Sequence, residues 1–489
     1  MTVFDVLDRY AELKGSKDGK KYDYSRARLK ENYNQFVDLW KAHYRGNVAG
    51  INSDVSFNGE ESYGITRQSM RLAKLIAQKW ATGLFSESFK VTLKDDQETE
   101  KFRQLEKQID FRSKVNQAAI FGYAEGSCCL LASADISTNT ETGTITGGKT
   151  KLDVIKYDSI YPLEFDQNDI KSVAFIRTET IKDKTTYIIS VHTIENGQAT
   201  VENITASVRG ERVEFTTPDT IKQCQVFDNP MYCIIRPNIA NDYSDLLPFG
   251  QSIFADSLAA CVDVDLAADL LRRDVQEGAQ VTFIGRDLLM EKMGKEGNKK
   301  KLFENTKGRF FTIPQPLAEK GGDIKQLFEK SVPEIRVSEL WEVVKNSLNW
   351  ACITSGLGKG TLDIVPMATA TQVIHTEAEK MQNKSLHEQF LEGQIIKIIK
   401  ALCELATLTG NPIDATEINI TFEDSVIVDT AEQKRLSLYE IESGVSSKAE
   451  YRMKYYGESL EDATAKIDAL KKEEKEDSPF DLQRFRSDL

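Results

Sequence analysis

The chain has 489 residues, a hydrophobic content of 40% and a formal net charge of −13. This hydrophobic content is enough for folded cores, and the length predicts two or three core-sized units. Because affinity for DNA comes largely from neutralising its phosphates, so acidic a chain excludes a protein that wraps DNA on a basic surface. A surface past which DNA moves without sticking is not excluded.

The cysteine pattern and the hydropathy of the chain indicate the cellular compartment in which the protein is expected. The seven cysteines form no C-x-x-C pair, which argues against a disulfide framework and favours a reducing environment. The amino-terminal residues lack the basic and apolar regions of a signal peptide. No run approaches the about 18 apolar residues of a membrane span. We therefore expect a soluble protein, made in the cytoplasm, with no membrane partner.

Helices predominate in the first 130 residues. Their apolar residues recur at three- and four-residue steps, which is typical of helices that pack on one face. The predicted helices span residues 2–14, 25–45, 66–82 and 97–121. Short strands are expected at 89–93 and 127–132.

A β-rich region follows, from residue 151 to about 236, where short β-branched and aromatic runs alternate with turn residues. The polar segment before it, 133–150, is predicted to be a loop or hairpin tip. We expect one antiparallel sheet, continuous with the strand at 127–132 and packed against the earlier helices. Residues 1–250 are therefore predicted to form a mixed α+β unit.

A long helix is predicted from Ser252, its N-cap, to residue 277. At 100° per residue, Asp256, Asp263 and Asp274 fall within roughly 20° of one another on its surface. The packing face is expected elsewhere on the helix, on Leu258, Val262, Leu266 and Leu270. The acidic face is a candidate functional surface, and an ordinary solvated face is the alternative.

Residues 278–333 are predicted to form a compact insert between this helix and the next, at 334–354. We expect the two helices to pack antiparallel as a stalk that carries the insert. Strands are predicted in the insert near 281–284 and 309–313, with a short helix near 286–293. The insert also holds a basic patch made of Lys295, Lys299, Lys300, Lys301, Lys307 and Arg309. This patch is a candidate surface for acidic partners or DNA, with a solvated loop as the alternative.

A glycine-rich loop at 355–368 follows the second stalk helix and is predicted to be flexible. Thr369 or Thr371 can cap the next helix, which continues to Thr409. Its about 40 residues would span about 60 Å, a length that is typical of a structural strut.

The last part of the chain is predicted to begin with a strand near 417–422 that returns to the first sheet. Helices are then expected at 430–442, 448–456 and 460–476. The segment 477–489 has no helical stripe and is expected to be flexible.

No near-motif for catalysis is complete. Residues 356–361 resemble a phosphate loop, but they lack its glycine spacing and the strand that precedes it. His387 is followed by Glu388 without the second histidine of a zinc-binding helix, and we expect it on a polar helix surface. We therefore predict no enzyme activity, no metal and no cofactor.

The order of these elements, together with several local phrases, resembles the portal proteins of tailed bacteriophages, the siphophage type in particular. The resemblance covers nearly the whole chain except the carboxyl-terminal tail. Its phrases are Tyr44-Arg-Gly46, 71–80 with Phe85-Ser-Glu87, Pro248-Phe-Gly-Gln-Ser252, 333–350, 369–372 and Glu442-Ser-Gly-Val-Ser446.

The resemblance implies a portal fold and a ring of twelve subunits at one capsid vertex of the virion, made in the host cytoplasm. Residues 1–250 and a returning strand at 417–428 would be the wing, which the segment 369–429 rejoins through the long helix. The other implied regions are a stem (251–277 and 334–354), a clip (278–333), a tunnel loop (355–368), a crown (430–476) and a flexible tail (477–489).

The same resemblance implies that double-stranded DNA passes through the ring without sequence recognition, during packaging and ejection. The stem aspartates would line the channel with negative charge, so that DNA stays centred and mobile. In the tunnel loop, Lys359 would touch phosphates briefly, while three glycines let the loop change shape and Pro366 limits how far that flexibility spreads. The candidate residues of the tunnel loop are Gly356, Gly358, Lys359, Gly360 and Asp363.

The implied partners are further copies of the chain, the terminase large subunit, a head-completion adaptor, and the major capsid and scaffolding proteins. The terminase motor would dock at the clip, and adaptors and the tail would later occupy the same end. Two alternatives stay open. One is another ring-forming connector or structural virion protein without a portal fold, and the other is an enzyme with an unrecognised site.

Overall fold

The computed structural model describes most of the chain, in two units that span residues 1–422 and 423–489. Within 281–331 and for the hairpin at 53–65, the description concerns the backbone. The described ranges are 2–19, 21–58, 61–85, 89–138, 145–166, 169–181, 184–195, 197–210, 212–216, 225–244, 248–277, 281–285, 291–293, 299–301, 310–313, 328–331, 336–362, 370–422, 437–441, 443, 447–456 and 462–469.

Some helices of the amino-terminal region begin or end at residues with clear capping roles. Thr2 and Asp5 form a capping box at the start of the first helix, and Gly46 ends α2 in a left-handed conformation. These helices are α1 (Val3–Asp18), η1 (Ser25–Arg28), α2 (Leu29–Arg45), α3 (Leu72–Phe85), α4 (Asp96–Gln108) and α5 (Phe111–Glu125).

Two of the predicted helices differ from those observed. The helix expected over 66–82 begins only at Leu72, because the preceding residues lead out of a hairpin of β1 (Ser53–Asn58) and β2 (Glu61–Thr66) that the sequence did not suggest. The helix expected over 97–121 is two helices. Asp110 has a φ of 53° between them, a left-handed conformation that no continuous helix allows.

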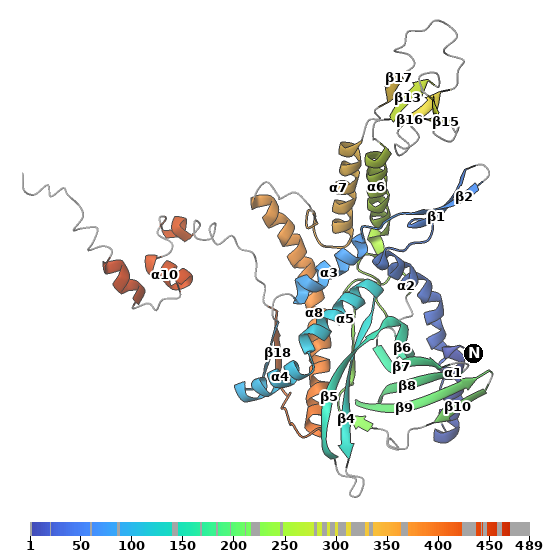
Figure 1. Ribbon diagram of the computed structural model, residues 1–489. Coiled ribbons are helices and arrows are strands. Elements are labelled where there is room, and N and C mark those ends of the chain that lie inside the picture. The colour runs from blue at the N-terminus through green and yellow to red at the C-terminus, as the bar shows by residue number, and fades with distance from the viewer. Residues whose placement is uncertain are drawn as a thin grey trace, which may run out of the picture. The chain divides into compact units, whose positions relative to one another are not determined.

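The β-rich region forms two sheets, so the prediction of one continuous sheet was wrong. The six-stranded sheet has the order β10-β9-β8-β7-β6, with β11 also paired to β9, and the second sheet has the order β12-β4-β5 (Figure 1). The strands are β4 (Cys128–Thr138), β5 (Ile145–Lys156), β6 (Ile160–Asp166), β7 (Asp169–Ile181), β8 (Lys184–Glu195), β9 (Gln198–Arg209), β10 (Arg212–Thr216), β11 (Gln225–Phe227) and β12 (Tyr232–Ile235). All these pairings are antiparallel. Most join consecutive strands, whereas β11 pairs with β9 and β12 returns to β4 from a distant part of the chain.

The strand that follows the long helix also pairs elsewhere than predicted. β18 (Ile418–Thr421) forms a two-stranded antiparallel sheet with β3 (Lys90–Leu93), not with the first sheet. Strand and helix contents together confirm the mixed α+β class with mainly antiparallel sheets.

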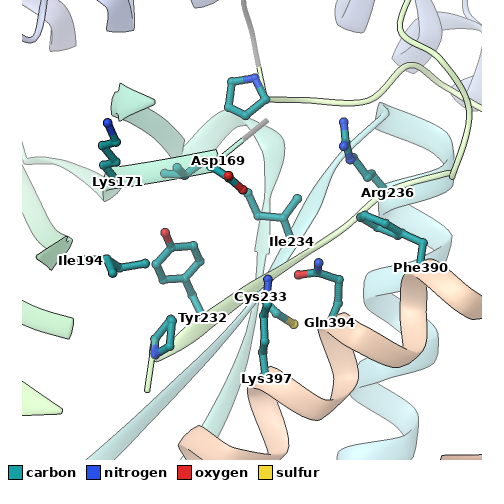
Figure 2. Close-up of a pocket in the computed structure, with 13 residues that line it drawn as sticks. Asp169, Lys171, Ile194, Tyr232, Cys233, Ile234, Arg236, Phe390, Gln394 and Lys397 are labelled. Atoms are coloured by element: carbon teal, nitrogen blue, oxygen red, sulfur yellow. The ribbon is translucent and has the colours of Figure 1, made fainter. Parts of the chain in front are cut away.

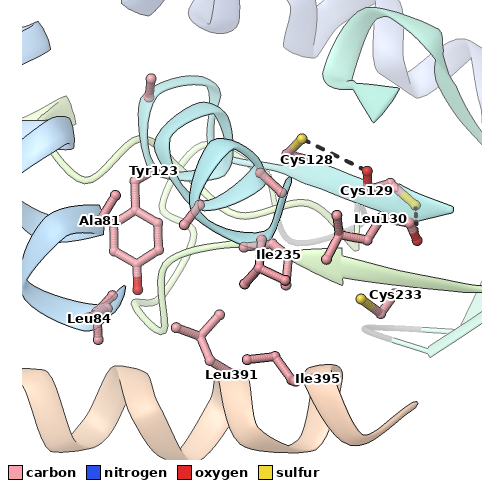
Figure 3. Packing of buried hydrophobic residues seen from close by; sticks show 14 of the residues in the cluster. Ala81, Leu84, Tyr123, Cys128, Cys129, Leu130, Cys233, Ile235, Leu391 and Ile395 are labelled. Carbon is pink, nitrogen blue, oxygen red and sulfur yellow. Dashed lines mark hydrogen bonds between the residues drawn. The ribbon is translucent and has the colours of Figure 1, made fainter. Parts of the chain in front are cut away.

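Two apolar clusters form the core of the first unit. The smaller one lies between α1 and one face of the six-stranded sheet. The larger one surrounds α5, where Tyr123 lies beside Ala81 of α3 and Leu391 of the long helix (Figure 3). The six cysteines that the structure describes are buried, free thiols. Beside β12, the long helix also borders a pocket lined in part by β7 (Figure 2).

The stalk and insert complete the first unit. After η3 (Ala255–Ser257) come α6 (Leu258–Glu277), the insert, α7 (Val337–Thr354) and α8 (Ala370–Leu408), whose 39 residues span about 58 Å. In the insert, β13 (Val281–Gly285) pairs parallel with β16 (Phe310–Ile313) and antiparallel with β17 (Phe328–Ser331). The prediction of a helix near 286–293 was wrong for its last residues, because these form the strand β14 (Glu291–Met293), which pairs with β15 (Lys299–Lys301).

Most described residues of the second unit are helical. Its segments 437–441, α10 (Lys448–Tyr456) and 462–469 fall within the three predicted helices. The expected tail, 477–489, lies outside the described residues.

Candidate functional site

The two stalk helices pack antiparallel, as their sequence predicts. At one end Arg336, just before α7, forms a two-point ion pair with Asp274 of α6, with both N···O distances 3.0 Å. At the other end Ser257 lies 2.7 Å from Thr354, hydroxyl to hydroxyl. Each end of α6 is therefore tied to the opposite end of α7, and Figure 1 shows the helices side by side.

The packing face of α6 is not the leucine stripe that the sequence favoured. Leu266 and Leu270 keep 36% and 43% of their surface exposed. The buried apolar positions of α6 are mostly small, and they are Ala260, Cys261, Val264 and Ala267. Small side chains let helix backbones approach closely, so the stripe with less apolar surface forms the interface.

The predicted acidic row of α6 is divided by its surroundings. Asp256, in η3, and Asp263, in α6, are both exposed, and Asp263 lies on the same side of α6 as Leu266 and Leu270. Asp274 is half-buried, and its hydrogen bonds with Arg336 lower the pKa of its carboxyl group. Of the three predicted residues, two therefore present free carboxylates to solvent, and the third holds the stalk helices together.

Ser252 does not cap the stalk helix, because α6 begins six residues later, at Leu258. Its hydroxyl group instead donates to the carbonyl oxygen of Tyr123, at 3.2 Å. The residues between Ser252 and the start of α6 form a turn and η3, and Phe254 and Ala255 are buried there. This buried entry ties the base of α6 to α5.

Two further aspartates of α6, Asp265 and Asp269, lie on its other side and are buried. Asp265 accepts from the backbone N–H of Met70 at 2.7 Å and from the side-chain amide of Asn52 at 3.2 Å. Asp269 forms ion pairs with Arg67 and Arg273 at 3.6 and 2.9 Å. Sequence reasoning missed them, although their spacing of four residues places both on one helix face.

The described part of the predicted tunnel loop, residues 355–362, is a hydrogen-bonded turn. Gly356, Gly358 and Gly360 have φ values of 74°, 79° and 86°. Side chains other than glycine rarely adopt this conformation, so the glycines are needed for the shape of the turn as well as for any flexibility. Lys359 is exposed at its tip. Asp363 and Pro366 lie outside the described residues.

The base of this turn is anchored on two helices. The indole N–H of Trp80 donates to the carbonyl oxygen of Ser355 at 2.8 Å, and the amide of Asn383 in α8 donates to that of Gly356 at 2.9 Å. Leu357, the residue that follows Gly356, is only 1% exposed. The turn therefore starts from a fixed point beside α3 and α8.

His387 was predicted on a polar surface, and this prediction was wrong. It is 4% exposed and packs against the ring of Trp80, with 4.7 Å between ring centres. Its Nδ1 accepts from the backbone N–H of Asn238 and lies 3.0 Å from the Tyr123 hydroxyl group. Burial lowers the pKa of His387 to about 4, so the neutral ring is a structural acceptor. The pattern failed because α8 is covered by other elements on more than one side.

Other predicted site residues belong to the insert. Lys299, Lys300 and Lys301 form β15, where the backbone alone is described. Lys295, Lys307 and Arg309 lie outside the described residues. The basic patch therefore stays a prediction.

A fixed cofactor site does not emerge from the parts of the chain that are described. Within those parts no three His, Cys, Asp or Glu side chains are placed to hold a metal ion. Nor is any helix there long and apolar enough to cross a membrane. Thr371 lies inside α8 and is not its N-cap, and Thr369 is outside the described residues.

Comparisons with known proteins add no identity. No protein-family model matches the chain, and no curated protein matches it.

Proposed function

We propose that the chain is the subunit of a portal, a ring at one capsid vertex of a tailed bacteriophage through which double-stranded DNA is packaged and ejected. The observation that carries this proposal is the order of the described elements along the chain, which is α6, a small sheet, α7, a tight turn at 355–362 and the 39-residue α8. In a portal, these elements correspond to stem, clip, stem, tunnel loop and long wing helix. The mixed α+β body would be the wing, and the helices of residues 430–476 would be the crown.

The charge on the stalk supports this function. The exposed Asp256, in η3, and Asp263, in α6, are seven residues apart in the sequence. Repeated around a ring, they would place carboxylates at two levels of a channel. Since DNA carries one negative charge per about 1.7 Å of its axis, such a wall repels the duplex and keeps it from adhering.

The anchored turn supports a contact with DNA that is brief and local. Lys359 is exposed between Gly358 and Gly360, and the base of the turn is held by Trp80 and Asn383. A single cation on a short, anchored turn can meet a phosphate without creating an adhesive surface. Asp274 would add little charge to the channel, because Arg336 already neutralises it.

The proposal includes the partners that a portal requires. These are further copies of the chain in a twelve-subunit ring, the terminase large subunit at the clip, a head-completion adaptor, and the major capsid and scaffolding proteins. The protein itself would perform no chemical step.

Electron microscopy of the purified full-length protein in negative stain tests the proposal. We expect closed rings with a central hole, and analytical ultracentrifugation should show an assembly of about twelve chains. A monodisperse globular monomer at micromolar concentration, unchanged by scaffolding protein, would overturn the proposal.

The channel role of the acidic row is tested separately, in particles assembled with the variant Asp256→Lys/Asp263→Lys. We expect less DNA packaged per head, because the reversed charges attract the duplex. The matched control is Asp38→Lys, which reverses an exposed charge on α2, away from the stalk. Rings that form normally and package DNA equally in both variants would remove Asp256 and Asp263 from the channel.

A further inference from the structure

A pocket of about 440 Å³ lies between the long helix α8, the edge strand β12 of the three-stranded sheet, and the start of β7 in the six-stranded sheet. α8 contributes Phe390, Gln394 and Lys397, which follow one another at steps of four and three residues along one side of the helix (Figure 2). The opposite walls come from β12 and from the start of β7. The volume falls within the range of small-molecule sites, about 300–1,000 Å³.

The charged side chains of this pocket are mainly positive, whereas the chain as a whole is negative. Among its described lining residues, Lys171, Arg236 and Lys397 are cationic, and only Asp169 is acidic. In a protein with a net charge of −13, this excess of positive charge is local. Among the described residues, none of these three cations forms an ion pair, so their charges are free to meet a ligand.

Arg236 is the cation of this pocket whose surroundings most favour an anionic ligand. It is partly buried, and burial lowers the pKa of its guanidinium group. Its guanidinium carbon lies 5.4 Å from the centre of the Phe390 ring. Its Cβ and Cδ atoms lie so close to Gly250 that a Cβ built there would meet them at 3.2 and 3.1 Å.

The aliphatic stem and the face of the guanidinium group are thus held by packing, while its edge carries the N–H donors. No hydrogen bond of this group to another described residue is present. A guanidinium group partly removed from water without an acceptor is unfavourable, whereas a planar carboxylate can accept two parallel N–H bonds from it.

The rest of the pocket is suited to an apolar body. Ile170, Ile234 and Phe390 are half-buried and line it, and Pro248 is buried at its border. Gln394 provides a neutral amide that points into the pocket beside Lys397 (Figure 2). Apolar walls with a few polar groups are typical of sites that hold a small organic molecule in one orientation.

We propose that this pocket binds a carboxylate carried on an apolar body, with the carboxylate on Arg236 and the apolar part against Ile170, Ile234 and Phe390. The carboxylate can belong to a free organic acid or to the carboxyl-terminal residue of a bound polypeptide. A polyanion such as DNA is not favoured, because the pocket is small and Asp169 would repel additional negative charge. This site is independent of the proposed channel.

Isothermal titration calorimetry on the full-length protein tests the proposal. The probes are 4-phenylbutyrate and, as a neutral match of the same shape, 4-phenylbutyramide. We expect the carboxylate to bind at least about tenfold more tightly, since hydrogen bonds to charged groups are the stronger ones. To identify the source, N-acetyl-Ala-Phe with a free carboxyl terminus is compared with its amidated form.

The variant Arg236→Gln should weaken carboxylate binding about tenfold or more. Lys397→Gln, at an exposed position, should weaken it by a smaller factor without risk to the fold. The control is Arg177→Gln, which removes the same charge from an exposed arginine on β7 outside the pocket. It should bind as the unchanged protein does, and circular dichroism should show that all three variants are folded.

The site is supported if either the free acid or the peptide acid binds and if Arg236→Gln and Lys397→Gln weaken that binding. Which of the two acids binds more tightly identifies the source of the carboxylate. The proposal is overturned if neither acid binds, if the amides bind as tightly, or if the pocket variants and Arg177→Gln behave alike. Ring formation is scored on the same samples, so failure of the pocket and failure of the portal proposal are told apart.

Discussion

The two sides of α6 carry the same residue type in opposite surroundings. Asp265 and Asp269 are buried. Asp265 accepts from donors near the β1–β2 hairpin, and Asp269 pairs with Arg67 from the same region and with Arg273 of α6 itself. Asp256 and Asp263 are exposed, and their carboxylates form no hydrogen bond or ion pair with another described residue. The comparison shows that an aspartate row has a functional meaning only where its charges are not already used to hold the fold.

Removing the charge of Asp269 should have the largest effect on stability. Asp269→Asn leaves Arg67 and Arg273 without their shared carboxylate. Because Arg67 is largely buried, we expect a loss of about 3 kcal/mol in the free energy of unfolding. Urea denaturation followed by circular dichroism measures it. A loss below about 0.5 kcal/mol, the range of ordinary surface substitutions, would show that the buried face is no more critical than the exposed one.

Asp265→Asn should have an intermediate effect. An asparagine oxygen can still accept from the backbone N–H of Met70, but it does so without charge, and its amide group meets the donor of Asn52. We expect a loss of about 1–2 kcal/mol in the same urea experiment. If Asp265→Asn were as damaging as Asp269→Asn, the charge rather than the geometry of this acceptor would be decisive.

Asp274 lies between the two cases, because it is in the predicted acidic row and yet pairs with Arg336. The pair lowers the pKa of Asp274 below its ordinary value of about 3.9. A lowered pKa stabilises the folded state above that value, and this contribution is lost as the pH falls through the folded-state pKa.

The melting temperature of Asp274→Asn should therefore be lower than that of the unchanged protein at pH 7. The difference should persist down to about pH 5 and shrink below pH 4. Arg336→Gln should show the same pH dependence, since it removes the other partner. A difference that grows on acidification would contradict this ion pair as its cause.

The smallest effect on stability is expected for the exposed row. Asp263→Asn should change the free energy of unfolding by less than about 0.5 kcal/mol, because Asp263 has no partner to lose among the described residues. Urea denaturation beside Asp269→Asn gives the direct comparison. A clear loss in Asp263→Asn would reveal a structural role for the row and weaken its assignment to a channel.

Local signals in the sequence determined much of this protein. Apolar periodicity predicted α1, α2 and the length of α8, and the flanking helices of the insert pack antiparallel as expected. Such features depend on neighbours within a few residues along the chain, which the sequence itself displays.

Tertiary structure alone decided which faces are buried. α6 packs through Ala260 and Val264 and leaves Leu266 exposed, and His387 is enclosed by Trp80 and Tyr123 from distant parts of the chain. Strand pairing was decided at the same level, since β18 joins β3 across more than three hundred residues. Burial and pairing depend on which segments meet in space, and periodicity along one segment cannot report the shape or the donors of the partner that covers it.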